Sequence, residues 1–290
     1  GTLTKTGGSM SLNNVVWRLS DDTSYSSNTE IETKTLLLNN NLLTLGTAGS
    51  DISVKDNMTF ENSSEQINTG LADLSLEGGL ILEEGKITST GGIVYLEKGG
   101  KQSGGILDIS DSTLKLGESF TKTAGTLTTT DDGTILELMK NLTVSSDSSI
   151  NFYQVALNNN TLTLGSESTD LQVSSALTLD NINERVMTGA ADLSLLAFQD
   201  ISIGGVTSTG GTISLLAGGQ LSGTGKLDVS GSTWTLGGDF VKSSGTLTIS
   251  QTNLALSGNS TLTSDEALSF VTLNLNDFTL TLGSSTSDLT

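Results

Sequence analysis

Short runs of alternating apolar and polar residues recur along the chain, and each run closes on a glycine. The clearest is Thr161–Gly165, in which Leu162 and Leu164 fall on one side of the alternation. An alternation with a period of two predicts a β-strand with one buried face. Related runs are Leu42–Gly46, Thr113–Gly117, Thr233–Gly237 and Thr279–Gly283. The chain is therefore expected to consist of short, repeated strands.

The closing glycines are regularly spaced. Glycines 46, 117, 165, 237 and 283 are separated by 71, 48, 72 and 46 residues. Each separation is close to a multiple of about 24 residues, and a fixed period of this size is typical of a repeated supersecondary unit. The skipped positions carry Gly70 and Gly189. We expect Gly46 to stack against Gly70, and Gly165 against Gly189, along one axis.

A longer repeat is superimposed on this short step. Leu45, Leu164 and Leu282 are separated by 119 and 118 residues. Five steps of about 24 residues would make one long repeat. The long repeats would cover residues 1–124 (a partial first copy), 125–244 and 245–290 (a partial third copy) of a single continuous solenoid spanning residues 1–290.

The strands and the residues between them predict an all-β, parallel β-helix (β-solenoid) of about twelve coils with about 24 residues per coil. Asn39–Asn41 and Asn158–Asn160 precede two of the strands, and asparagine tolerates the left-handed backbone of a tight corner. No segment carries a long helical pattern, although residues 181–188 leave room for one turn. Tandem immunoglobulin-like sandwiches fit the repeat of 119 residues but not the shorter step.

Composition supports a thin core with a polar jacket. Apolar residues make up 34% of the chain and aromatic residues 4%. The net charge of −19 disfavours binding to nucleic acid or to anionic lipid. There is no proline, which suits a chain composed almost entirely of hydrogen-bonded strands, and no cysteine, which excludes disulfides. No apolar run is long enough for insertion into a membrane.

The short coil step, the Gly, Asn and Thr corners, and the lack of proline and cysteine resemble the large repetitive secreted adhesins of bacteria, of the filamentous-haemagglutinin and autotransporter-passenger style. This resemblance implies an extracellular or cell-surface location. It also implies a structural or adhesive role as a stiff stalk or filament building block. The expected partners are further repeats of the same chain, another copy stacked end to end, or cell-surface glycans.

The residues offer little for catalysis. The chain has no histidine, and Arg18 and Arg185 are its only arginines. The acidic pairs Asp21-Asp22 and Asp131-Asp132 are typical of exposed turns and do not recur in register. We expect no enzyme, and predict no catalytic, cofactor-binding or metal-ligating residues.

Calcium is the one cofactor that the carboxylates leave open, because oxygen ligands suit this cation. No calcium-binding repeat or EF-hand loop is present, however. Aspartates recur where strands begin, so a role in shaping strand ends explains them. These residues are Asp51, Asp73, Asp170, Asp192 and Asp288.

A glycan-binding or glycan-cleaving β-helix is the alternative function, and it requires a groove with clustered Asp and Lys beside an exposed aromatic ring. The candidate rings are dispersed in sequence: Trp17, Tyr25, Tyr95, Tyr153 and Trp234. Trp234 takes the place that Leu114 has in the earlier copy, so we predict that Trp234 belongs to the core. Thr-x-Thr pairs, as in Thr161–Thr163 and Thr246–Thr248, suggest an ice-binding face, but they fall at different phases of the step.

Overall fold

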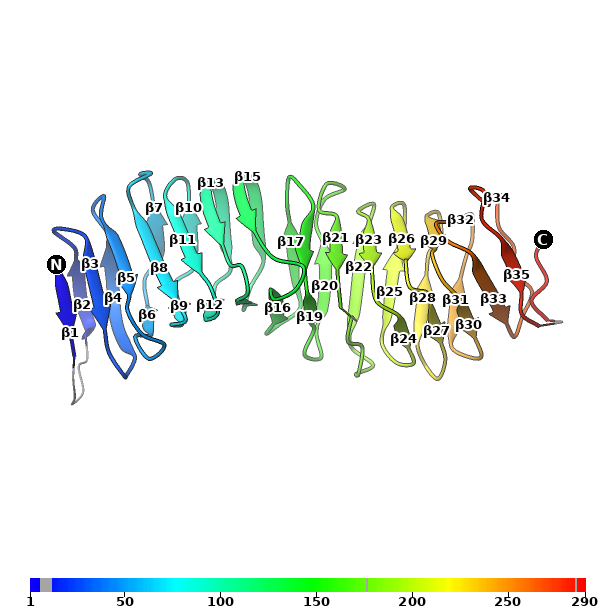
Figure 1. Ribbon diagram of the computed structural model, residues 1–290, viewed down its shortest axis with the longest axis horizontal. Helices are drawn as coiled ribbons and strands as arrows, with labels where there is room; N and C mark the ends of the chain where they lie inside the picture. The colour runs from blue at the N-terminus through cyan, green and yellow to red at the C-terminus, as the bar shows by residue number, and fades with distance from the viewer. Residues whose placement is uncertain (6–11, 176, 285) are drawn as a thin grey trace. The chain divides into compact units, whose positions relative to one another are not determined.

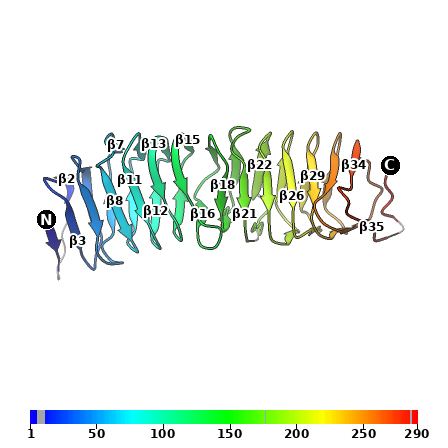
Figure 2. The same cartoon turned by 45° about the horizontal axis from the view of Figure 1, so that its top comes forward.

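The computed structural model describes residues 1–5, 12–175, 177–284 and 286–290. It forms two compact units, Gly1–Lys140 (unit 1) and Asn141–Thr290 (unit 2). Every element in the described ranges is a β-strand, and all the pairings within each unit are parallel. Figures 1 and 2 show the strands of each unit stacked in successive coils. The all-β parallel solenoid predicted from the sequence is confirmed.

Each full coil of unit 1 contributes one strand to each of three sides. The β5 side contains β1 (Thr2–Thr4), β3 (Thr23–Ser26), β5 (Leu42–Leu45), β8 (Gln66–Gly70), β11 (Lys86–Ser89) and the ends of β13 (Gly100–Asp108) and β15 (Phe120–Thr128). The β9 side contains β2 (Leu12–Arg18), β4 (Ile31–Leu37), β6 (Ile52–Val54), β9 (Leu74–Leu76), β12 (Ile93–Leu96), β14 (Thr113–Leu116) and β16 (Ile135–Leu138). The β10 side contains β7 (Met58–Phe60), β10 (Leu80–Leu82) and the beginnings of β13 and β15.

Unit 2 has three corresponding sides. The β20 side contains β17 (Leu142–Ser145), β20 (Thr161–Leu164), β22 (Arg185–Gly189), β25 (Gly205–Ser208), β28 (Lys226–Asp228) and β31 (Thr246–Thr248). The β23 side contains β18 (Ile150–Phe152), β21 (Leu171–Val173), β23 (Leu193–Leu195), β26 (Thr212–Leu215), β29 (Thr233–Leu236), β32 (Asn253–Leu256) and β34 (Thr272–Asn274). The β27 side contains β24 (Gln199–Ile201), β27 (Gly219–Leu221), β30 (Phe240–Lys242), β33 (Ser260–Ser264) and β35 (Leu280–Leu282). The remaining strand is β19 (Gln154–Ala156).

The coil step is shorter than the predicted 24 residues. Residues paired between β9 and β12, such as Leu74 and Val94, are 20 apart, and those paired between β6 and β9 are 22 apart. A step of 24 occurs between β5 and β8, where Leu43 pairs with Ile67, and between β20 and β22. At about 20 residues per turn, the chain has about 14 coils rather than twelve.

The two long steps explain why the sequence suggested 24. Each contains a tight extra turn closed by a glutamate. The carboxylate of Glu65 accepts the backbone N–H groups of Glu61 and Asn62, and Glu184 does the same for Asp180 and Asn181. These two coils directly follow β5 and β20, which carry the clearest strand pattern. The glycine spacing read from the sequence therefore reflected the long steps rather than the usual ones. The pairing runs from Leu42 and Gln66 to Thr44 and Asn68 in unit 1, and from Thr161 and Arg185 to Thr163 and Met187 in unit 2, and it ends before the glycines. That Gly46, Gly70, Gly165 and Gly189 stack along one axis stays a prediction.

The long repeat is also not a whole number of coils. Strands β20 and β35 are copies of each other in sequence, separated by 118 residues. However, β20 pairs with β22 on one side of unit 2, whereas β35 pairs with β33 on another side. One long repeat therefore shifts the equivalent strand to a different side of the coil. That residues 1–290 form a single continuous solenoid stays a prediction.

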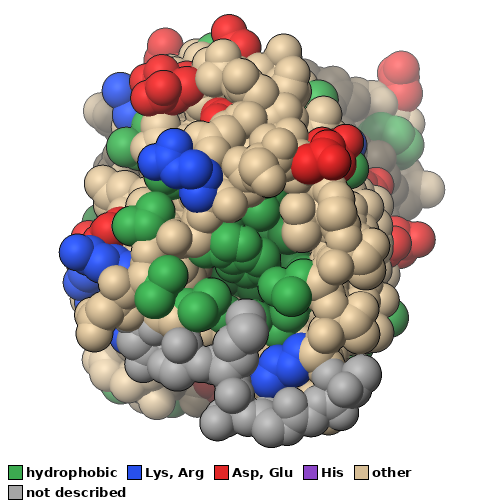
Figure 3. Space-filling view, turned by 90° about the vertical axis from the view of Figure 1, so that its left-hand side faces the viewer, with side chains coloured by type: hydrophobic (Ala, Val, Ile, Leu, Met, Phe, Trp, Pro, Cys, Tyr) green, Lys and Arg blue, Asp and Glu red, His purple; other side chains and the backbone are tan. Residues whose placement is uncertain are grey.

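The core is one side chain deep and forms ladders along the stack. In unit 1, Ile31, Ile52, Leu74, Val94, Leu114 and Leu136 lie directly above one another. All six are at most 1% exposed. Burying a side chain of this size contributes about 1.5–3 kcal/mol, so each rung adds a similar increment. Viewed from the N-terminal end of unit 1, hydrophobic side chains gather at the centre and charged groups lie around them (Figure 3).

Corners are shaped by asparagine, as expected. Asn158 and Asn159 have φ angles of 51° and 66°, and Asn39 and Asn40 have 50° and 65°. The side-chain amide of Asn39 donates to the carbonyl oxygen of Leu19 in the preceding coil, at 2.8 Å. These corners therefore combine the left-handed backbone that asparagine tolerates with a hydrogen bond between coils.

Candidate functional site

A column of outward side chains crosses the β9 side of unit 1. Its members are Glu32, Ser53, Ser75, Tyr95, Lys115 and Glu137, which occupy matching positions in successive strands. They point outward because each lies between two inward, buried residues, as Tyr95 lies between Val94 and Leu96. Successive strands are about 4.8 Å apart, so the side chains of neighbouring members can touch.

Lys115 links two other members of the column. Its ammonium lies 5.7 Å from the centre of the Tyr95 ring, within the range of a cation–π contact. It also lies 3.6 Å from the carboxylate of Glu137. The charge of Lys115 is therefore balanced by Glu137, and the Lys115 side chain contacts one side of the Tyr95 ring.

A hollow of about 320 Å³ opens beside this column. The carboxylates of Glu30, Asp51 and Asp73 lie along one edge, where three successive strands begin. The other lining residues are Leu74, Ser75, Ile93, Tyr95, Lys115 and Met139. We call this site the Tyr95 hollow. It combines carboxylates, an aromatic ring and a hydroxyl group in one place.

The carboxylates of the Tyr95 hollow carry negative charge that nearby cations do not balance. Partial burial, followed by repulsion from Glu32 and Asp51, raises the pKa of Glu30. Burial also raises the pKa of Asp51, and the charge of Asp73 adds to it, while a hydrogen bond from the Asp73 backbone acts in the opposite direction. A cation in the hollow would relieve this repulsion.

Asp51 and Asp73 also have a structural role. One oxygen of Asp51 accepts the backbone N–H of Asp73 at 2.9 Å, and one oxygen of Asp73 accepts that of Ile93 at 2.8 Å. Unit 2 repeats the arrangement, since Asp170 accepts from Asp192 and Asp192 from Thr212. The prediction that these four aspartates shape strand starts is confirmed. Asp288 instead accepts through its backbone carbonyl, from Leu268.

The equivalent column of unit 2 has none of this chemistry. On the β23 side the matching outward positions are Asn151, Gln172, Ser194, Ser214, Thr235 and Ala255. Ser214 stands where unit 1 has Tyr95, and Thr235 where it has Lys115. The equivalent coils of unit 2 therefore form with small uncharged side chains at these positions.

The other aromatic side chains lie away from the Tyr95 hollow. Trp234 is fully buried and packs edge-on against Phe240, with ring centres 4.8 Å apart, so its predicted place in the core is confirmed. Tyr25 is also buried and lies edge-on to Trp17. Tyr153 is 38% exposed in unit 2. Tyr95 is thus the aromatic residue that shares its surroundings with clustered carboxylates and a lysine.

The remaining candidates from the sequence form no site. Asp21, Asp22, Asp131 and Asp132 are exposed, and Asp22 accepts the backbone N–H of Leu42. The Thr-x-Thr pairs of β20 and β31 are separated on the β20 side by coils that carry Arg185 and Met187, Gly205 and Thr207, and Lys226 and Asp228. No group of three or more His, Cys, Asp or Glu residues able to hold a metal ion occurs in the described ranges.

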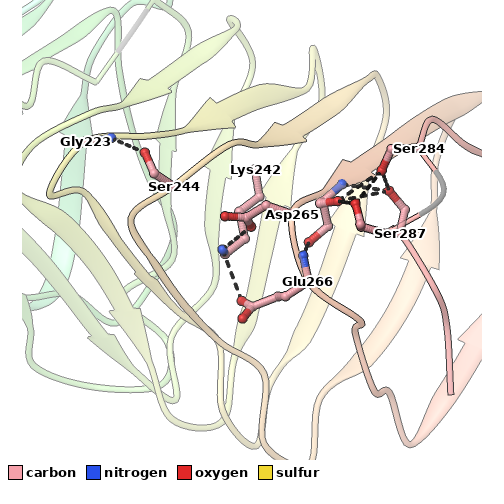
Figure 4. Close-up of polar contacts among 9 residues, drawn as sticks. Gly223, Lys242, Ser244, Asp265, Glu266, Ser284 and Ser287 are labelled. Carbon is pink, nitrogen blue, oxygen red and sulfur yellow. Dashed lines mark hydrogen bonds and ion pairs between the residues drawn. The ribbon is translucent and has the colours of Figure 1, made fainter.

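A second charged cluster lies in unit 2 (Figure 4). Lys242 points inward from the end of β30, and its side chain is only 4% exposed. Its ammonium donates a hydrogen bond to Asp265 and lies 3.1 Å from Glu266, both in the loop after β33. Burial by itself would lower the pKa of Lys242, but the two carboxylates outweigh burial and raise this pKa above its usual value. The hydrogen bond from Lys242 lowers the pKa of Asp265.

The sequence did not reveal the column beside the Tyr95 hollow because the predicted coil step was too long. With steps of 20–22 residues, Ser53, Ser75, Tyr95, Lys115 and Glu137 fall in one column. With a step of 24 they scatter around the coil. Lys242 was missed for another reason. Alternation predicts that its side chain points inward, but it does not predict that two carboxylates from the next coil will pair with the buried ammonium.

These observations define a class: the chain is a parallel β-solenoid protein with a chemically distinct side in unit 1. No protein-family model matches the chain, and comparisons with curated proteins and with solved structures give no match either. Within the described ranges, no helix is long and apolar enough to cross a membrane.

Proposed function

We propose that the chain is a structural and adhesive segment of a long extracellular repetitive surface protein, in which it acts as a stiff stalk. The observation that carries this proposal is the parallel pairing of strands from coil to coil within each unit. Each coil bonds to the next along the axis through backbone hydrogen bonds and through a ladder of inward side chains. Such a stack resists bending because successive coils are hydrogen-bonded to one another on two or three sides.

The surface supports the same proposal. The net charge of −19 is spread over the outward positions, and ion pairs such as Lys55–Glu32 and Lys98–Glu118 connect them. A strongly acidic jacket keeps neighbouring stalks apart through electrostatic repulsion. The partners that fit the stack itself are further coils of the same kind, from the same chain or from another copy joined end to end.

Mechanical unfolding of single molecules tests the stalk. A solenoid pulled from its ends releases its coils successively, and a coil of 20–22 residues adds about 70 Å of extended chain. We expect a series of small, regular steps of that length. A single large step for each unit would contradict the proposal, because it would indicate globular domains rather than stacked coils.

The location is tested separately with an antibody raised against the purified chain. We expect the antibody to label intact, unpermeabilised cells of the source organism. Labelling that requires permeabilisation would contradict an extracellular role, whatever the mechanical result.

Glycan binding is the second candidate function, and the Tyr95 hollow favours it. The hollow supplies an aromatic ring, carboxylates and the Ser75 hydroxyl at one surface site, the mixture that carbohydrate recognition requires. Depletion of the protein from solution by immobilised polysaccharides is the first test. Retention on one glycan that is lost in Tyr95→Ser would support this function, and retention on none would exclude it.

A further inference from the structure

We infer that the Tyr95 hollow recognises a cationic glycan, a chain of amino sugars with protonated amines. This inference deepens the second candidate function and rests on it. It starts from the partners of each side chain. Glu32 is paired with Lys55 at 3.3 Å, and Glu137 is paired with Lys115 at 3.6 Å. Glu30 is exposed, and the charges that act on its carboxylate are those of other acidic residues, Glu32, Asp51, Asp73 and Glu77.

Asp51 and Asp73 each use one carboxylate oxygen for the backbone of the next coil. The second oxygen of each remains for a ligand. With Glu30, these carboxylates place three negative charges on successive coils along one edge of the hollow. Mutual repulsion and partial burial already act on Glu30 and Asp51, so an ammonium group bound between them would be stabilised.

Tyr95 distinguishes a sugar from a simple cation. On one side its ring is contacted by the Lys115 ammonium, and the next coil on the other side presents only the small Ser75. The ring is therefore bordered by open space within the hollow. An amino sugar can place its C–H face and its ammonium against that ring while its hydroxyl groups reach Ser75.

The spacing of the coils suits a linear glycan. The three carboxylates recur once per rung, about 4.8 Å apart, and one sugar of an extended chain advances by a similar distance. Because neighbouring sugars of a β-1,4-linked chain face opposite ways, the amines on one face recur at every second sugar and would meet every second rung. An extended peptide places side chains on one face every second residue, about 6.6–7 Å apart, which does not match the rungs.

Unit 2 has the same kind of coil without the aromatic ring and the lysine of the Tyr95 hollow. At the positions of Tyr95 and Lys115, unit 2 has Ser214 and Thr235 in the same kind of coil. Substitutions copied from unit 2 therefore remove the recognition chemistry with side chains that the architecture already accepts.

Isothermal titration calorimetry with the full 290-residue chain tests the inference. The probes are a glucosamine oligomer, the same oligomer fully N-acetylated, and an oligolysine of equal charge. We expect the glucosamine oligomer to bind at least about tenfold more tightly than the acetylated one, the difference made by a desolvated cation–π or ionic contact. Tyr95→Ser should weaken binding about tenfold, and Glu30→Gln several-fold. Ser214→Ala in unit 2 is the matched control and should leave binding unchanged.

Each other outcome is informative. Equal binding of the free and acetylated oligomers, lost in Tyr95→Ser, would overturn the cationic ligand but retain glycan binding. Binding of oligolysine that is as tight as that of the glucosamine oligomer and unaffected by Tyr95→Ser would show general attraction to an acidic surface and overturn the site. No binding of either oligomer would overturn the inference, whereas the glycan-binding function is overturned only if the depletion assay shows retention on no polysaccharide.

Discussion

Serine and threonine hydroxyl groups form hydrogen bonds between coils at the corners that follow β5, β20 and β35, the strands whose sequence pattern repeats most clearly. After β20, Thr169 is fully buried, and its hydroxyl accepts the backbone N–H of Ser146 in the preceding coil at 2.7 Å. Ser166 contacts the same hydroxyl at 2.6 Å. The corner after β5 repeats this arrangement with Thr47 and Ser50, and the corner after β35 with Ser284 and Ser287 (Figure 4).

The closing glycines belong to the same corners. A Cβ atom added at Gly165 would collide with the hydroxyl oxygen of Ser145 in the preceding coil, and one added at Gly46 would collide with that of Ser26. Neither glycine needs a left-handed backbone. The close approach of two coils favours glycine at these positions, although the colliding atom is the end of a rotatable serine side chain, so a Cβ atom there would first displace that hydroxyl.

A prediction at this scale concerns Thr169→Val. The change keeps the shape of the side chain but leaves the N–H of Ser146 without its acceptor inside the core. We expect a loss of about 1–3 kcal/mol in the free energy of unfolding, measured with urea, and faster hydrogen exchange at the Ser146 amide. Ser168→Ala is the control, because its hydroxyl is exposed and contacts the Ser146 carbonyl oxygen and the Ser166 hydroxyl but accepts no buried backbone N–H. Equal effects of the two substitutions would contradict a special role for Thr169.

At the scale of the elements, each strand contributes inward side chains to a ladder along the stack. Most ladders contain apolar side chains, but one in unit 2 contains a buried lysine. On the β27 side of unit 2, Leu221, Lys242 and Ser264 occupy one column. The lysine is tolerated there because the loop after β33 brings Asp265 and Glu266 to its ammonium. The cluster thereby fastens β30 to the loop of the following coil.

This fastening predicts an asymmetry between partners. The double variant Asp265→Asn, Glu266→Gln leaves Lys242 buried without a counter-charge, so we expect a loss of about 1–3 kcal/mol. That is less than for a fully buried pair because the carboxylates are about half exposed. Lys242→Met leaves the carboxylates in water and fills the space, so we expect a change within about 1 kcal/mol. A larger loss in Lys242→Met than in the double variant would contradict this account.

The same cluster gives a pH dependence. The pKa of Asp265 is lowered in the folded chain, so its contribution to stability is present above the ordinary aspartate pKa of about 3.9 and disappears as the pH falls through the folded value. The pKa of Lys242 is raised, so its contribution is present below about 10.4 and disappears as the pH rises through the folded value. The difference in melting temperature between the wild type and the double variant should therefore be largest between these limits and shrink outside them.

At the scale of the whole molecule, charge repulsion opposes folding. The chain has 32 Asp and Glu but 13 Lys and Arg, so a net charge of −19 remains even if every cation is paired. The ion pairs are also partly exposed, as for Lys98 and Glu118 at 51% and 48%. Exposed pairs of this kind contribute little. Repulsion among the remaining carboxylates is the larger electrostatic effect.

Stability should consequently rise with salt. Raising the ionic strength from about 0.01 M to about 0.15 M shortens the screening length from about 30 Å to about 8 Å and weakens this repulsion. We expect the melting temperature, followed by circular dichroism, to increase by several degrees with sodium chloride. Sucrose, an uncharged osmolyte, is the control. Added in low salt, it stabilises folded proteins generally without screening charge, so its effect on the melting temperature shows how much of a rise general stabilisation can produce. A fall in melting temperature with salt would mean that the ion pairs dominate.

The sequence by itself determined the parallel solenoid and its thin core, because alternation with a period of two and glycine-closed corners are local properties of the chain. It also determined the asparagine corners, the buried position of Trp234 and the role of Asp51, Asp73, Asp170 and Asp192 at strand starts. Only the tertiary structure decided the coil step. That step depends on which residues pair between coils, and two glutamate-closed turns lengthen the very coils that the glycine spacing measured. The same pairing decided the functional candidates. Tyr95, Lys115 and Glu137 are separated by about one coil each in the chain and become neighbours only when the coils are stacked in their true register.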